Sequence, residues 1–198
     1  GGPMIAIMLR LFSAHDVTAL DDVARTKLLA CVMAVADEAR RGGPVGLDDA
    51  STARWRERLI EALASDSLPR RRSPAATNHT THVSVVDERG NAASVTFSYG
   101  EGNAHIIGDS GIMMNNLMGE EDLFPDGFDN VARGERLPTM MSPTLIMRDD
   151  GGETVMGTGG ANRIRTAIVQ VVSQLLDHGS DAERATAAPR SHYEDGVL

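Results

Sequence analysis

The sequence has a single cysteine among its 198 residues, and its basic side chains are outnumbered by acidic ones. One cysteine excludes an internal disulfide and a cysteine-rich metal site. The formal net charge of -9 argues against nucleic acid or anionic lipid as the main partner. No apolar run reaches the roughly 20 residues that a membrane-spanning helix requires. We therefore expect neither a nucleic-acid partner nor a membrane span.

The chain also lacks an initiator methionine and the pattern of a signal peptide, since it begins GGPMIAIMLR. We therefore expect it to be a fragment of a longer protein. Its length suffices for one core, or for one domain and part of another. An apolar content of 41% and a charged content of 24% are ordinary for a globular protein.

Two helices are predicted in the first third of the chain. Apolar residues recur at three- and four-residue spacing over 16–42, and the segment ends in RRGG, which is typical of a helix C-terminus. A second helix is predicted over 47–65, where Trp55 and Leu59 share a face. The segment SDSLPRRRSPAATNH, 65–79, has two prolines, three consecutive arginines and no periodicity. It predicts an exposed, mobile connector.

Strands are predicted after this connector. THVSVVD (81–87) and AASVTFS (92–98) alternate on either side of ERGN, which indicates a hairpin. The segment 144–160, TLIMRDDGGETVMGTGG, repeats the pattern of strand, glycine-rich turn and strand. The segment 162–179 then predicts a helix that ends at Gly179.

Thr80 and Thr81 stand where the predicted connector meets the first strand. Threonine is common in strands, so β-propensity is one explanation for both residues. The other is that the chain is cut before a threonine, whose own α-amine then serves as the base for its hydroxyl. That amine titrates at about 7.7–8.0 in model peptides, so it can accept a proton near neutral pH. The two residues alone leave both explanations open.

Gly159 and Gly160 lie in GTGGANRI, just before the last predicted helix. The N–H groups of such a pair, reinforced by the helix N-terminus, can stabilise an oxyanion. A tight strand-to-helix turn and a phosphate-binding nest are the alternatives. Asn115 and Asn116 are either loop caps or ligand contacts, and Ser142 can bond to its own backbone in a turn.

Four motifs in a fixed order resemble the small catalytic subunit of the γ-glutamyltranspeptidase family over roughly residues 78–198. The resemblance implies an α+β protein with the N-terminal-nucleophile hydrolase fold, an αββα sandwich that is incomplete in a fragment. It divides the chain into a large-subunit-like helical region (1–67), a connector ending at a self-cleavage site (68–79) and a small-subunit-like catalytic region (80–198). The motifs are TTHVSVVDERGNAASVT (80–96), GDSGIMMNNLM (108–118), MMSPT (140–144) and GTGGANRI (157–164).

The resemblance also implies catalytic roles. Thr80 would be the nucleophile, and self-cleavage would fall between His79 and Thr80. Thr81 would help to position the new amine, and Ser98 would support the nucleophile's hydroxyl. The glycine pair described above would stabilise the oxyanion. No metal or organic cofactor is implied, and we expect His79 and His82 to be a pair without partners.

The implied substrate-binding positions depart from the family's pattern. Gly100 replaces an asparagine, Glu120 is one methylene longer than the usual aspartate, and Met140 replaces one of two serines that grip an α-carboxylate. Such changes affect the specificity of a site more than its chemistry. The implied substrate-binding residues are Gly100, Asn116, Glu120, Thr139 and Met140.

The resemblance thus implies an amidohydrolase or acyltransferase that moves a γ-glutamyl or related acyl group from glutathione-like amides to water, amino acids or peptides. Two alternatives are an acylase for another group, such as the glutaryl group of a β-lactam, and a non-catalytic relative. Family members are often periplasmic or secreted, and large and small subunits from one precursor form a heterodimer. We expect the fragment to be unstable in isolation, because an incomplete sandwich exposes apolar sheet surface.

Overall fold

The computed structural model describes residues 1–42, 45–65, 80–120, 123–124, 127–194 and 196–198. The chain forms two compact units. Gly1 and Ala75–Ile164 make up the first, which we call the sheet unit. Gly2–Pro74 and Arg165–Leu198 make up the second, which we call the helical unit. The helical unit therefore combines segments from both ends of the sequence.

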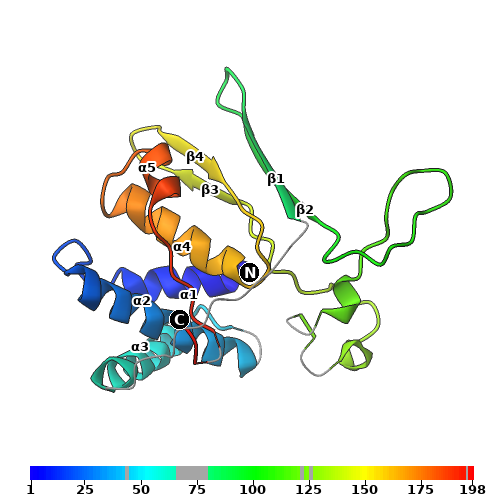
Figure 1. Cartoon of the computed structure of the whole chain (residues 1–198). Helices are drawn as coiled ribbons and strands as arrows, with labels where there is room; N and C mark the ends of the chain where they lie inside the picture. Colours follow the sequence, from blue (N-terminus) through cyan, green and yellow to red (C-terminus); the bar gives the residue numbers. More distant parts are fainter. Residues whose placement is uncertain (43–44, 66–79, 121–122, 125–126, 195) are drawn as a thin grey trace. The chain divides into compact units, whose positions relative to one another are not determined.

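Buried side chains of α1, α2 and α4 make up most of the core of the helical unit. Figure 1 shows the path of these helices. Ile7, Val32 and Val169 are fully buried, one from each of these helices. The helices are α1 (Gly2–Phe12), α2 (Asp22–Arg41), α3 (Asp49–Ala64), α4 (Arg163–Leu176, which begins in the sheet unit) and α5 (Ala182–Ala187).

The three helices predicted from periodicity are confirmed, with shorter bounds. The first begins only at Asp22, because the Asp21 carboxylate caps it by accepting a hydrogen bond from the Ala24 N–H at 2.8 Å. The second begins at Asp49, because Asp48 caps it in the same way. Helix α1 was not predicted. None of the described helices is both long and apolar enough to cross a membrane.

A buried arginine joins three segments of the helical unit. The Arg165 side chain on α4 is only 3% exposed. Its Nη2 atom lies 3.6 Å from Asp37 Oδ1 on α2 and 3.3 Å from Glu194 Oε1 near the C-terminus. Asp37 also pairs with Arg40 and Arg41. A buried charge is tolerated only when it is paired in this way, so this contact fixes α4 against α2.

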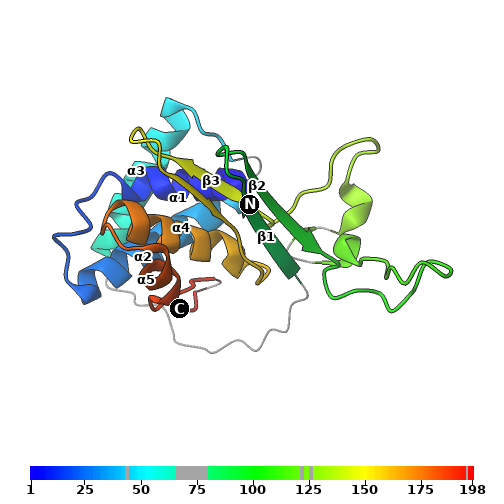
Figure 2. The same cartoon turned by 90° about the horizontal axis from the view of Figure 1, so that it is seen from above.

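The sheet unit contains two separate antiparallel pairs of strands (Figure 2). Both hairpins predicted from alternation are confirmed. Thr80 pairs with Ser98 at the open end of the first hairpin, and Thr144 pairs with Met156 in the second. The strands are β1 (Thr80–Val86), β2 (Ala92–Ser98), β3 (Thr144–Met147) and β4 (Glu153–Met156), and two short 3-10 helices, η1 (Leu117–Gly119) and η2 (Phe128–Asn130), lie between the hairpins.

Helices together with two small antiparallel sheets confirm the α+β class. The predicted connector, 68–79, lies outside the described residues. The predicted division at residue 80 stays a prediction. It concerns where the chain is cut, whereas the two units are defined by contacts between residues. The helical unit takes in residues on both sides of that division.

Candidate active site

The register of the first hairpin brings two hydroxyl groups together. Thr80 opens β1 and faces Ser98, the last residue of β2. Thr80 Oγ1 lies 3.1 Å from Ser98 Oγ, within hydrogen-bond distance. Ser98 Oγ also accepts a hydrogen bond from the Gly100 N–H at 3.0 Å. Since a hydroxyl can accept and donate at once, this contact leaves the Ser98 proton free to orient Thr80 Oγ1.

The turn after β4 approaches the same threonine. A Cβ atom at Gly159 would lie 2.9 Å from both Thr80 Cβ and the Thr80 carbonyl oxygen, so only glycine fits there. Gly160 has φ 129, a left-handed conformation that also favours glycine. Within the described residues, neither N–H group donates a hydrogen bond to an acceptor. The predicted glycine pair thus lies beside Thr80 with its donors available, and its role in stabilising an oxyanion stays a prediction.

Four of the five predicted substrate-binding positions line one small pocket in the sheet unit with Thr80 and Ser98. Its volume of about 40 Å³ holds roughly one water molecule, far less than a typical ligand site. The four positions are Gly100, Glu120, Thr139 and Met140.

Asn116, the fifth position, supports the loop beside this pocket. Its Oδ1 atom accepts hydrogen bonds from the N–H groups of Glu101 at 2.8 Å and Gly102 at 3.1 Å. A Cβ atom at Gly100 would lie 2.4 Å from this oxygen and 2.3 Å from Glu120 Oε1. Asn116 therefore acts as a loop cap here. The lack of a side chain at Gly100 leaves room for both the Asn116 and the Glu120 side chains beside the backbone.

The other predicted positions lie elsewhere. Thr81 points to the opposite face of β1 from Thr80 and is exposed, so any effect on the amine would pass through its backbone. His79 lies outside the described residues. Ser142 donates a hydrogen bond from Oγ to the Met140 carbonyl oxygen at 3.1 Å, which confirms the backbone-bonding explanation for this residue.

His82 is hydrogen-bonded through both nitrogens of its ring. Its Nδ1 atom lies 2.9 Å from Thr96 Oγ1, and its Nε2 atom lies 2.9 Å from Ser84 Oγ. These residues share one face of the hairpin, since Thr96 is the cross-strand neighbour of His82. The alternation of polar side chains in HVS and SVT was the pattern that could have revealed the cluster. No group of three or more metal-ligating side chains is found in the part of the chain that the structure describes.

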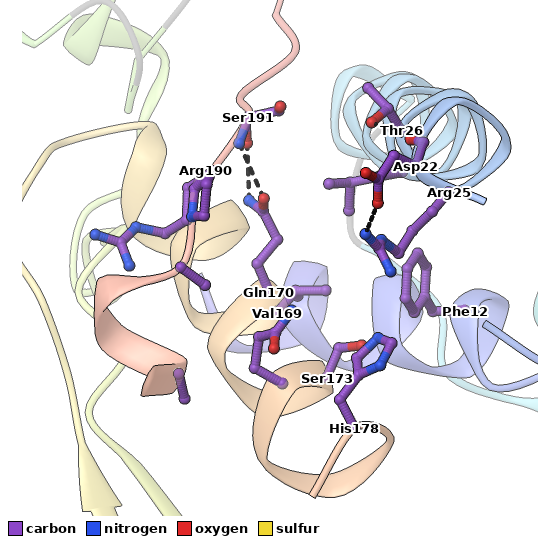
Figure 3. A pocket seen from close by; sticks show the side chains of 15 residues that line it. Phe12, Asp22, Arg25, Thr26, Val169, Gln170, Ser173, His178, Arg190 and Ser191 are labelled. Carbon is purple, nitrogen blue, oxygen red and sulfur yellow. Dashed lines mark hydrogen bonds and ion pairs between the residues drawn. The ribbon is translucent and has the colours of Figure 1, made fainter. Parts of the chain in front are cut away.

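A larger pocket of about 270 Å³ lies in the helical unit, between α1, α2, α4 and α5 (Figure 3). None of the predicted site residues lines it. Two pairs of its lining residues bond to each other: the Gln170 side chain exchanges hydrogen bonds with the Ser191 backbone, and Arg25 pairs with Asp22 (Figure 3). Most of the predicted substrate-binding positions line the smaller pocket at Thr80 instead.

The chain is similar to known proteins. Residues 29–196 match the family model described as Gamma-glutamyltranspeptidase. The Glutathione hydrolase proenzyme of Escherichia coli (strain K12) is 36% identical over 143 residues, 66% of this chain and 25% of that protein. The Acylase ACY 1 proenzyme of Pseudomonas sp. (strain SE83) is 33% identical over 169 residues, 84% of this chain and 30% of that protein. The chain thus spans less than a third of the length of these relatives.

Solved structures of γ-glutamyltranspeptidases resemble the chain as well. The enzyme from Pseudomonas nitroreducens complexed with L-DON gives a TM-score of 0.51 at 32% identity, over 58% of this chain and 66% of that one. A mutant of the Helicobacter pylori enzyme gives 0.51 at 33% identity, over 58% and 68% of the two chains. The neighbours have the N-terminal-nucleophile hydrolase fold predicted from the motifs. With a family match over most of its length and a relative that is 33% identical over 84% of it, the chain belongs to the γ-glutamyltranspeptidase family.

Proposed function

We propose that the protein cleaves itself before Thr80 and then transfers a γ-glutamyl group from glutathione-like amides to water, amino acids or peptides. The observation that carries this proposal is the position of Thr80 Oγ1, 3.1 Å from Ser98 Oγ, with Gly159 packed directly against the same residue. The glutathione hydrolase relative from Escherichia coli supports it.

In the proposed reaction, the α-amine freed at Thr80 takes the proton from Oγ1 as this oxygen attacks the amide carbonyl carbon. The carbonyl oxygen becomes an oxyanion, and the N–H groups of Gly159 and Gly160 donate to it. When the intermediate collapses, the carbon–nitrogen bond breaks and the departing amine takes the proton from the Thr80 ammonium. Water or an amine then attacks the resulting ester and regenerates the hydroxyl group. The steps require no group besides these residues and the substrates.

Two lining residues are suited to a γ-glutamyl group. The Glu120 carboxylate carries the charge that an α-ammonium group requires, and the Thr139 hydroxyl can donate to an α-carboxylate. The pocket is too small to hold the whole group. We therefore propose that residues outside this chain complete it.

The proposal includes a heterodimer of the two cleavage products. Helices α1–α3 precede the proposed cut, and α4 follows it. Within the helical unit, α1, α2 and α4 contribute to one core, and the buried ion pair between Arg165 and Asp37 joins α4 to α2. Contacts of this kind would hold the products together after cleavage.

The first test is an intact-mass spectrum of the full-length protein. We expect two fragments, the second beginning at Thr80. Thr80→Ala should give a single uncleaved mass, because it removes the nucleophilic oxygen. Thr80→Ser is the matched control, and it should still cleave because it retains a hydroxyl at the same position. Equal cleavage in Thr80→Ala, or none in the wild type, would refute the proposal.

An acylase for another acyl group is the second candidate. The acylase relative covers 84% of the chain, and Leu117 and Met140 make the pocket more apolar. The cleaved protein should be offered γ-glutamyl and glutaryl anilides, which differ in one α-ammonium group. We expect kcat/KM to favour the γ-glutamyl compound by at least about tenfold, and Glu120→Gln to reduce that ratio, because Glu120 carries the opposing charge. A preference for the glutaryl compound would favour the acylase.

A further inference from the structure

One side chain contacts the glycine turn from the same strand face as the nucleophile. His82 follows Thr80 by two residues on β1, so both side chains project from one face of the strand. Both ring nitrogens of His82 have partners on that face, Thr96 Oγ1 and Ser84 Oγ, each at 2.9 Å. With a hydrogen bond at each nitrogen, the plane of the ring is fixed.

The fixed ring lies directly against Gly157. A Cβ atom at Gly157 would come within 2.3 Å of both Cε1 and Nδ1 of His82, so no larger residue fits without moving the ring. The His82 ring therefore explains why residue 157 is a glycine, because the ring occupies the space that a side chain would need. The preceding residue is held as well, because Ser94 Oγ donates a hydrogen bond to the Met156 carbonyl oxygen at 3.0 Å. The first hairpin thus contacts both Met156 and Gly157, where β4 ends and the turn begins.

Two residues further along the turn, Gly159 contacts Thr80. The turn therefore meets β1 twice, at His82 through Gly157 and at Thr80 through Gly159. The distance between the turn's N–H groups and Thr80 Oγ1 depends on the first contact, because the connection between Gly157 and Gly159 is short. Donors that stabilise an oxyanion must be placed before the charge develops.

We propose that His82 is a positioning residue, which sets the glycine turn at the correct distance from the Thr80 nucleophile. This inference rests on the proposed function, since it assumes that the turn supplies the oxyanion donors. His82 takes no part in bond making in this account. It acts through Gly157, and its loss should weaken the transition state more than substrate binding.

The test is a double-mutant cycle in the full-length protein with His82→Ala and Gly157→Ala. We expect His82→Ala to lower kcat about 10- to 100-fold, with KM within about threefold of wild type, because the donors shift while the pocket remains. Gly157→Ala should also lower kcat, since its methyl group collides with the ring. The double variant should recover part of the loss, because that methyl group then occupies the space of the removed ring. His105→Ala removes an exposed histidine of the same unit and should leave kcat unchanged.

Losses that multiply in the double variant would overturn the proposal, and so would an unchanged kcat in His82→Ala. If His82→Ala cleaves itself too slowly for kcat to be measured, the extent of self-cleavage is compared between the variants instead. Recovery of cleavage in the double variant supports the inference, and no recovery overturns it. A wild-type protein that neither cleaves itself nor hydrolyses a γ-glutamyl anilide would instead refute the proposed function, so the two failures are distinguishable.

Discussion

The two units of the chain are stabilised in different ways. Among the described residues, Phe124 and Ile164 are the only buried apolar side chains of the sheet unit, whereas α1, α2 and α4 supply most of those in the helical unit. One face of the first hairpin leaves Val83, Val95 and Phe97 exposed. The residues proposed to carry the chemistry all belong to the unit with the smaller core. The proposed reactive groups therefore lie in one unit, and most of the buried apolar side chains lie in the other.

Hydrogen bonds and turn conformations take the place of packing around the site. Asn116 holds the loop after β2 through two backbone N–H groups, and Ser98 bonds both Thr80 and Gly100. Exposed hydrogen-bonded segments with few buried apolar contacts open locally at lower free energy than a helical core. This difference supports our expectation that the isolated chain is unstable, which stays a prediction.

The largest expected effect comes from removing a core side chain of the helical unit. Ile7 on α1 is fully buried. In the 198-residue chain, Ile7→Ala should lower the free energy of unfolding by about 2–5 kcal/mol, because it removes buried methyl groups and leaves a cavity. Urea unfolding followed by the fluorescence of Trp55, the single tryptophan, measures this change in the helical unit itself.

Phe97→Ala is the matched variant in the sheet unit. The Phe97 side chain is 59% exposed, so its truncation should change the unfolding free energy of the hairpin by less than about 0.5 kcal/mol. Amide hydrogen exchange of β1 and β2 measures this change in the sheet unit itself. Equal losses for the two variants would mean that the exposed face of the hairpin is packed in solution. The contrast between the units would then be wrong.

Much of this arrangement could be predicted from the sequence, because its causes are local or repeated. The periodicity of the segments that become α2 and α4 follows from one buried face per helix. Alternation predicted the two hairpins, and both kinds of pattern need only spacing along the chain. The grouping of Ser98 and Gly159 with Thr80 was implied by the resemblance of the motifs to the family, and no spacing rule predicts it.

The features that escaped prediction depend on contacts between distant residues. Helix α1 begins with Gly2 and Pro3, and Arg10 is the single polar side chain among its eleven residues, so the sequence lacks the polar face that marks a helix. Proline is nevertheless tolerated in a first turn, where its missing N–H group has no intrahelical partner to lose. The role of Asn116 depends on N–H groups 14 and 15 residues away. His82 meets Gly157 across two hairpins, and no spacing rule reports such a contact.

The smallest expected effect concerns the turn of the first hairpin, where the side chains are exposed. The pKa of Asp87 is lowered, chiefly by the hydrogen bond that the Asn91 side chain donates to its carboxylate at 2.7 Å, with help from the backbone N–H groups of Asn91 and Arg89. A carboxyl group with a lowered pKa stabilises the folded state above its ordinary pKa of about 3.9. That contribution is lost as the pH falls through the folded value.

Asn91→Ala should therefore raise the pKa of Asp87 toward its ordinary value, because it removes the largest cause of the shift. An NMR titration of the Asp87 carboxyl carbon in both proteins measures this directly, and the hairpin should begin to open at a higher pH in the variant. Arg89→Ala is the control, since Arg89 contributes only its backbone N–H group and the substitution retains it. An Asp87 pKa that is the same with and without Asn91 would show that the backbone alone orders this turn. Side-chain hydrogen bonds would then contribute less to the stability of the sheet unit than we infer from its comparison with the helical unit.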